Sequence, residues 1–123
     1  MPEFKLPHNH GQEMEHHFDH MPKTEEFTVV SDLFKLLGDS SRIRIFWILC
    51  HCEECVTNLS VMMDMTSPAV SHHLKLLRGN GLITSRREGK EVYYKAADTE
   101  RVEMLHKMIE KMVSISCPGS NSI

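Results

Sequence analysis

A short apolar stretch, a tight turn and a capped polar helix follow one another between residues 56 and 81, and no other feature constrains the fold as much. Ser67 is expected to cap the second helix, with Pro68 at its first helical position, where proline is favoured. Asn80-Gly81 is expected to end this helix. Its buried stripe is predicted to consist of Val70, Leu74 and Leu77. The succession predicts a helix-turn-helix unit.

The outward face of the second helix is polar and carries hydroxyl, imidazole and cationic groups. In a helix-turn-helix, this recognition helix lies in the major groove and contacts bases near its N-terminus. Hydroxyl and imidazole groups can bond to base edges, and cationic side chains can neutralise phosphates. The predicted DNA-binding residues of this helix are Ser67, Pro68, Ser71, His72, His73, Lys75 and Arg78, with His73 near the edge of the apolar stripe.

The stretch "LITSRREGKEVYYKA" alternates apolar and polar residues on both sides of "EGK". This pattern predicts a two-stranded β-hairpin with Gly89 in its turn. Its basic side chains are placed to contact the flanking DNA backbone or minor groove, and they are Arg86, Arg87 and Lys90. The predicted fold is therefore mainly α with one β-hairpin, a winged helix-turn-helix.

Three further helices are expected before this hairpin and one after it. The first begins at a capping box with Thr24 as its cap, carries Phe27 on its apolar face and ends near Gly38. The next is capped by Asp39 or Ser40, and its inward face is predicted to be Ile43, Phe46, Trp47 and Cys50. A third, short one spans about 56–64, with Leu59, Met62 and Met63 inward. The last runs from about Asp98 to Ser116, with a stripe of Val102, Leu105, Ile109 and Met112.

Charge is distributed unevenly along a chain whose net charge is −3. Residues 1–32 contain seven acidic and two basic side chains, whereas residues 67–95 contain six basic and two acidic ones. A local excess of positive charge matters for phosphate binding more than the total does. The basic excess coincides with the predicted recognition helix and hairpin.

The organisation expected is a histidine-rich arm over residues 1–24, a winged helix-turn-helix DNA-binding domain over 25–117 and a tail over 118–123. No apolar run approaches the roughly 20 residues needed to span a bilayer. The N-terminus has no apolar segment typical of a signal peptide. A cytoplasmic protein without a membrane partner is the expectation.

Three blocks in this order, "LFKLLGDSSRIRIFWIL", "SPAVSHHLKLLRGNGLI" and "SRREGKEVYYKAAD", resemble the ArsR/SmtB family of bacterial metal-responsive repressors over roughly residues 30–113. The resemblance implies a homodimer built largely by the first and last helices. It also implies repression at a double-stranded operator DNA, relieved when an effector binds.

The resemblance places one effector site at the third helix, where relatives carry a motif resembling ELCVCDL. Here "EECVTNL" puts Cys55 at the first cysteine, while Thr57 replaces the second and Asn58 stands at an acidic ligand position. Cys52 adds a Cys-x-x-Cys spacing that can chelate an ion. In such relatives the N-terminal arm supplies the remaining ligands.

This arm is rich in histidines, of which His16 and His20 lie at i, i+4. Imidazole and thiolate together suit zinc or a softer ion such as cadmium. The predicted metal ligands are therefore Cys52, Cys55, His8, His10, His16, His17 and His20.

A second family site on the last helix is degraded, since Lys111 and Ser114 replace ligands. His106 and Glu110 could form a shifted version, although a surface pair is favoured. The alternative function is a thiol-based redox or persulfide sensor on the same scaffold, using Cys50, Cys52 or Cys55 with Cys117. An enzyme is not expected, since nothing in the sequence resembles a substrate pocket.

Overall fold

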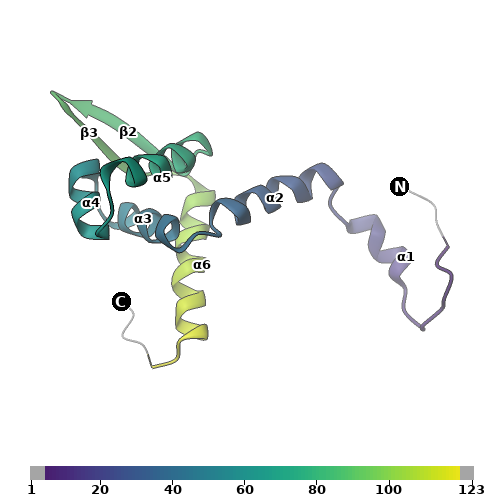
Figure 1. Ribbon diagram of the computed structural model, residues 1–123. Coiled ribbons are helices and arrows are strands. Elements are labelled where there is room, and N and C mark those ends of the chain that lie inside the picture. Colours follow the sequence, from purple (N-terminus) through teal and green to yellow (C-terminus); the bar gives the residue numbers. More distant parts are fainter. Residues whose placement is uncertain (1–4, 120–123) are drawn as a thin grey trace. The chain divides into compact units, whose positions relative to one another are not determined.

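The computed structural model of the protein describes residues 5–119, and the chain divides into two compact units, residues 1–35 and 36–123. The first unit contains α1 (Met14–His17), the short 3-10 helix η1 (Phe18–His20) and nearly all of α2 (Thr24–Leu36), all labelled or coloured in Figure 1. The boundary between these units falls inside α2, and the limit of the arm at residue 24 stays a prediction.

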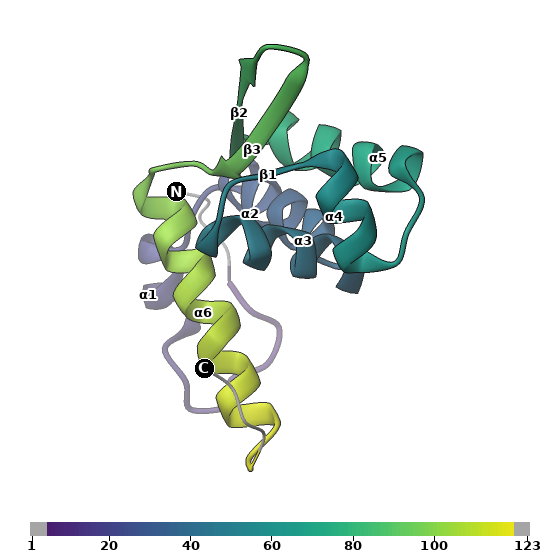
Figure 2. The ribbon, with the colours of Figure 1, turned by 90° about the vertical axis from the view of Figure 1, so that its left-hand side faces the viewer.

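The second unit carries the predicted helix-turn-helix and hairpin. Figure 2 shows the hairpin projecting beyond the helices, with a short strand, β1, beside β3 at its base. The elements in chain order are α3 (Ser40–His51), β1 (Glu54–Cys55), α4 (Val56–Met63), α5 (Ser67–Gly79), β2 (Ile83–Glu88), β3 (Glu91–Ala96) and α6 (Glu100–Ser116).

Local hydrogen bonds set where α4 ends and α5 begins. Asp64 adopts the left-handed conformation (φ 51°) and closes α4, which aspartate tolerates better than most residues. The Thr66 hydroxyl accepts a hydrogen bond from the Ala69 N–H at 3.3 Å. Thr66 is therefore the cap, and the expectation that Ser67 caps this helix is wrong by one residue, because Ser67 is already helical.

The starts of α2 and α3 are also fixed by carboxylates. The Asp39 side chain accepts from the Arg42 N–H at 3.0 Å, which selects Asp39 over Ser40 as the cap of α3. In α2, Glu26 accepts from the Lys23 N–H at 2.8 Å. This reciprocal half of a capping box lies one residue earlier than expected, so Thr24 is inside the helix rather than its cap.

The predicted hairpin is present, and a third strand joins it. β2 and β3 are antiparallel from the Ile83–Ala96 pair to the Glu88–Glu91 pair, and Gly89 adopts a positive φ of 63° in the two-residue turn. β1 pairs with the other edge of β3, placing Cys55 opposite Tyr93. The sheet order is β1-β3-β2.

The core of the second unit lies between α3, α4, α5 and the start of the hairpin. All three residues of the predicted α5 stripe are buried. The predicted inward face of α3 is only partly right, because Phe46 is buried but Ile43, Trp47 and Cys50 are half-buried. Apolar side chains surround most of this helix, so its sequence does not distinguish one face. The largest fully buried side chains are Phe46, Ile45, Leu59, Leu74, Leu77, Leu82 and Val70.

Two helices expose apolar side chains to solvent. In α6, Val102 and Leu105 are buried, but Met112 of the predicted stripe is 54% exposed, and Met62 of α4 is likewise exposed. α2 exposes Phe27, Val29, Val30 and Phe34, and α6 exposes Met104, Met108, Met112, Val113 and Ile115. Within residues 5–119, no helix is long and apolar enough to cross a membrane.

Candidate functional site

The outer face of α5 presents polar and basic groups to solvent. The Thr66 cap starts the helix and the buried stripe orients it, so the opposite face is held outward. The predicted DNA-binding residues that are exposed on this face are Ser67, Pro68, Ser71, His72, Lys75 and Arg78. A shallow groove of about 360 Å³ follows this face toward the sheet and is lined by Ser71, Leu74, Lys75, Arg78, Gly79 and Tyr94.

His73 differs from the expectation. It is only 8% exposed, and its Nδ1 has no hydrogen-bond partner within the described residues. Burial lowers the pKa of its imidazole, while Asp39 nearby opposes that shift. The expectation that His73 lies near the edge of the apolar stripe and contacts DNA is therefore corrected, because its side chain is buried. His73 follows His72 by about 100° around the helix, which turns it inward beside Leu74 and Leu77.

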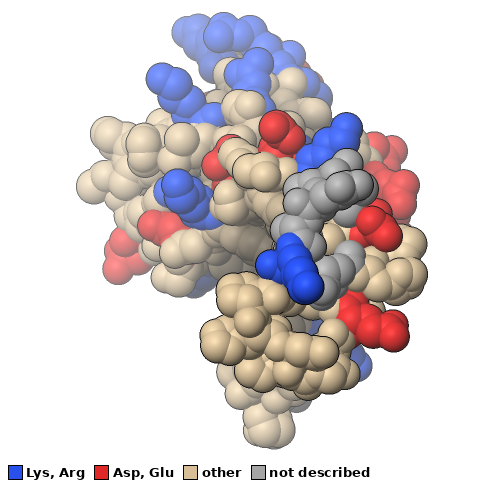
Figure 3. Space-filling view, turned by 90° about the vertical axis from the view of Figure 1, so that its right-hand side faces the viewer, with Lys and Arg blue, Asp and Glu red and all other residues tan. Residues whose placement is uncertain are grey.

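The β2–β3 hairpin, which is the wing of the winged helix-turn-helix, carries the second group of basic side chains. Figure 3 shows Lys and Arg side chains gathered at the upper end of the molecule, where the hairpin lies in Figure 1. Arg87 and Lys90 are exposed near the hairpin turn. This end of the unit combines a polar helix face with exposed cationic side chains, a pairing that suits a phosphate backbone beside a major groove.

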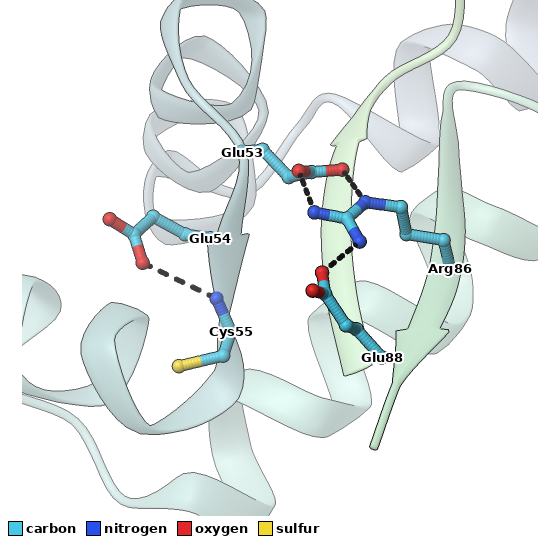
Figure 4. Close-up of polar contacts among 5 residues, drawn as sticks. All are labelled: Glu53, Glu54, Cys55, Arg86 and Glu88. Carbon is cyan, nitrogen blue, oxygen red and sulfur yellow. Dashed lines mark hydrogen bonds and ion pairs between the residues drawn. The ribbon is translucent and has the colours of Figure 1, made fainter. Parts of the chain in front are cut away.

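Arg86 is placed differently from the other two. Its guanidinium donates to both carboxylate oxygens of Glu53, at 2.9 and 2.7 Å, and also contacts Glu88 (Figure 4). It lies over the Tyr93 ring, 4.8 Å from the centroid. These hydrogen bonds lower the pKa of Glu53 and raise that of Arg86. In the free protein, two carboxylates therefore already compensate the Arg86 charge.

Cys55 occupies the junction between the sheet and the helix-turn-helix. Its Sγ accepts a hydrogen bond from the Asn58 N–H at 3.5 Å and caps α4. Glu54 accepts from the Asn58 amide at 2.8 Å and from the Cys55 N–H (Figure 4). Cys55 also pairs with Tyr93 through the backbone, so this residue contacts both α4 and the wing.

Burial disfavours the thiolate form of the other two clustered cysteines, Cys50 and Cys52. Burial raises the pKa of Cys50 to about 11, and the Glu110 carboxylate adds to this shift. Burial and Glu54 also raise the pKa of Cys52, whose side chain is exposed. A raised pKa leaves few thiolates at neutral pH, although a bound metal displaces the proton.

The predicted metal ligands lie in both units. In the arm, the ring centroids of His16 and His20 are 5.8 Å apart, and those of His8 and His10 are 5.9 Å apart. The described residues contain one group of three close ligand atoms, His51, His106 and Glu110. The sequence indicated the last two as a pair, but it did not indicate His51, which precedes α6 by about fifty residues.

Known proteins resemble much of this chain. A family model described as "Bacterial regulatory protein, arsR family" matches residues 39–85, from the α3 cap into β2. The "Transcriptional repressor SmtB homolog" of Synechocystis is 34% identical over 83 residues, which are 68% of this chain and 63% of that protein. The chain belongs to the ArsR family.

A second relative supports the same ArsR-family assignment. The "Cadmium resistance transcriptional regulatory protein CadC homolog" of Staphylococcus aureus is 38% identical over 77 residues, or 62% of this chain and 63% of that protein. The chain thus covers less than two thirds of the length of either relative. Members of this family are transcriptional regulators rather than enzymes, in agreement with the sequence expectation.

Solved structures confirm the ArsR-family fold. The homodimeric winged helix-turn-helix DNA-binding domain Mb0332 from Mycobacterium bovis superposes with a TM-score of 0.69 at 25% identity. The match covers 82% of this chain and 93% of that domain. The prediction of a winged helix-turn-helix, mainly α with one hairpin, is therefore confirmed, with β1 as an addition.

Proposed function

We propose that this protein is a DNA-binding transcriptional repressor that acts as a homodimer on an inverted-repeat operator. The observation that carries the proposal is the exposed polar face of α5 beside the basic wing. Ser71 and His72 are the proposed base-reading residues, while Lys75, Arg78, Arg87 and Lys90 neutralise phosphates. Ser67 and Pro68 are also proposed to contact DNA, because the N-terminal residues of a recognition helix lie beside the base edges.

Exposed apolar residues on α2 and α6 support a dimer. These two helices expose more large apolar side chains than a helix surface that faces solvent normally does. Covering them in a dimer would remove apolar area from water. The related Mb0332 domain from Mycobacterium bovis is homodimeric. A two-fold dimer places two recognition helices about 34 Å apart, which matches half-sites one DNA turn apart.

The proposed effector is a divalent ion, zinc first and cadmium second. We propose that the arm histidines and the Cys52/Cys55 region jointly coordinate this ion, because neutral imidazole and thiolate are the ligands that both ions prefer. The close His16 and His20 rings support a shared ion in the arm. The cadmium-resistance role named for the Staphylococcus aureus relative supports an ion of this class.

Cys55 is the residue through which a bound ion would change DNA affinity. A metal ion on Cys55 would replace its capping hydrogen bond at α4, which packs on the recognition helix, and would pull on the strand paired with the wing. The ion lowers DNA affinity only if it binds the DNA-incompetent state more tightly. A coupling free energy of about 1–3 kcal/mol is typical of such switches.

The thiol-sensor alternative is less well supported. A reactive cysteine needs a lowered pKa, whereas Cys50 and Cys52 have raised ones. The two mechanisms are distinguishable by experiment, because a thiol switch does not need the arm histidines.

The test begins with selection of bound duplexes from a random pool by the full-length, metal-free protein. We expect enrichment of an inverted repeat with half-site centres about 10 bp apart. Equal binding of selected and random duplexes would refute the repressor proposal. Zinc or cadmium is then added to the protein–duplex complex while DNA release is followed by fluorescence anisotropy.

Two full-length variants locate the effector. One is Cys55→Ser, and the other changes His8, His10, His16, His17 and His20 to Ala. Both should need far more metal for release, with Thr57→Ser as the matched control on α4. If both release DNA at the wild-type metal concentration, the proposed ligand set is wrong. If an oxidant releases DNA from the arm variant while metal releases none from wild type, the thiol alternative is right.

A further inference from the structure

Three potential ligands converge where the end of α3 meets α6. His51 is the last residue of α3, and His106 and Glu110 lie one turn apart on α6. The two Nε2 atoms of His51 and His106 are 3.0 Å apart. Glu110 oxygens lie 3.3 Å from the His106 Nε2 and 3.9 Å from the His51 Nε2. All three residues belong to the second unit, so their distances are set within one compact body.

Neighbouring rings hold the two imidazoles in this arrangement. The half-buried Trp47 ring, one turn before His51 on α3, lies 4.1 Å from the His51 ring between centroids. His51 and His106 meet edge to face, with centroids 4.7 Å apart and planes at 87°. Fixing the rings before an ion arrives reduces the entropy lost on binding. The cluster is therefore preorganised rather than a chance contact of free side chains.

Hydrogen bonding alone satisfies this cluster poorly. In the neutral state, a proton on one Nε2 can be donated to the other Nε2 or to the carboxylate. The second Nε2 then has a lone pair and no proton to offer Glu110. One nitrogen lone pair and a carboxylate thus compete for the single proton between them. A cation at the centre satisfies every one of these acceptors.

The spacing suits a metal ion. Ligand atoms at about 2.0–2.1 Å from a tetrahedral zinc ion are separated from one another by roughly 3.3 Å. The two nitrogens are 3.0 Å apart, and each lies 3.3 or 3.9 Å from a different oxygen of Glu110, so all three distances are near this value. The His51 and Glu110 side chains are 38% and 37% exposed, which leaves room for water at a fourth position.

We propose that His51, His106 and Glu110 form a divalent transition-metal site, separate from the arm and from Cys52/Cys55. Two imidazoles and one carboxylate select borderline ions such as zinc and cobalt over calcium or magnesium, which prefer oxygen alone. The ion ties α3, which packs on the recognition helix, to α6, which exposes the apolar surface proposed for the dimer. The site stands whether or not the protein is a repressor.

Cobalt(II) binding to the full-length protein tests this proposal without DNA. The parent variant carries Cys52→Ser, Cys55→Ser and alanine at the five arm histidines, and it is purified with chelator. We expect one cobalt ion per chain, with the visible absorption of a four- or five-coordinate ion and without sulfur-to-metal charge transfer. Absence of cobalt absorption in this parent would overturn the proposal.

Single changes in the same parent identify the ligands. His51→Gln, His106→Gln and Glu110→Gln should each weaken cobalt binding about 100-fold or more, since loss of even outer-sphere partners costs 10- to 100-fold. Glu103→Gln on α6 and His72→Gln on α5 are matched controls and should bind like the parent. Far-UV circular dichroism checks that each variant is folded. Binding unchanged in both histidine variants would refute the site, and a strong charge-transfer band would assign the ion to Cys50 or Cys117 instead.

Discussion

Arg86 on β2 and Glu53, which precedes β1, form a two-point ion pair across the central strand β3 (Figure 4). The guanidinium lies over Tyr93, the strand partner of both Arg86 and Cys55. The wing is thereby attached to the segment that starts the helix-turn-helix. The predicted contact of Arg86 with phosphate would therefore compete with its contacts to Glu53 and Glu88.

We expect the basic side chains of the wing to contribute unequally to DNA affinity. Lys90→Ala should weaken binding to all sequences alike and reduce the salt-dependence slope by about 1, because one phosphate contact is lost. Arg86→Ala should reduce the slope by less, since its charge is already compensated by Glu53 and Glu88. Anisotropy titrations at several salt concentrations measure both slopes. An equal or larger slope change in Arg86→Ala would show that DNA displaces the carboxylates.

The exposed face of α5 should determine sequence preference. Ser71→Ala and His72→Ala should each weaken binding to the selected duplex by about 1–3 kcal/mol, with little change for random DNA, because base contacts rather than phosphate contacts are lost. Competition titrations give this ratio. Lys107→Ala on α6 is the control. If His72→Ala discriminates between the duplexes like wild type, α5 does not read bases through this residue.

The Thr66 cap should contribute to stability more than an exposed threonine that caps no helix. Thr66→Ala removes the hydrogen bond to the Ala69 N–H and should lower the free energy of unfolding by about 1 kcal/mol. Thr57→Ala, within α4, removes no cap and should change it by less than about 0.5 kcal/mol. Urea denaturation measures both values. Equal effects would mean that Ser67 takes over the capping role.

His73 should make stability depend on pH. Burial lowers the pKa of the folded imidazole, although Asp39 opposes this and Arg42 and His72 add to it. An unfolded histidine titrates near 6.5, so below this pH the unfolded chain binds the proton first. Stability is then retained above about pH 6.5 and lost as the pH falls toward the folded pKa.

The comparison variant for this pH effect is His73→Gln, because the other eight histidines are common to both proteins. Urea denaturation between about pH 7.5 and 5 should show a steeper decline for wild type than for the variant. Parallel declines would indicate that another group is responsible.

The exposed apolar surface of α6 should maintain the dimer. Met108→Glu places a charge within this surface and should shift the protein to monomers, because the charge would lose water on association. Val61→Glu on α4 changes an equally apolar and more exposed side chain, and should leave the dimer intact. Sedimentation velocity at micromolar concentration distinguishes the two. Dimers in Met108→Glu, or monomers in wild type, would contradict this assignment.

Features that depend on neighbouring residues could be predicted from the sequence. The apolar stripe of α5 and the β2–β3 hairpin turn at Gly89 follow from spacing and backbone preference, which operate within a few residues. The start of α5 could be predicted only to within one residue, because a threonine and a serine adjoin at Thr66-Ser67 and both can cap. The resemblance carried by three sequence blocks was sufficient for the family.

Features that depend on distant partners were decided only by the tertiary structure. α3 is apolar around most of its circumference, so packing against α5 and the sheet chose Ile45 and Leu49 over Ile43 and Trp47. β1 has two residues, too few to show a pattern, and exists because the edge of β3 offers hydrogen bonds. His73 turned inward because burying Leu74 and Leu77 fixed the rotation of α5. His51 reached His106 across 55 residues, a contact that no local preference encodes.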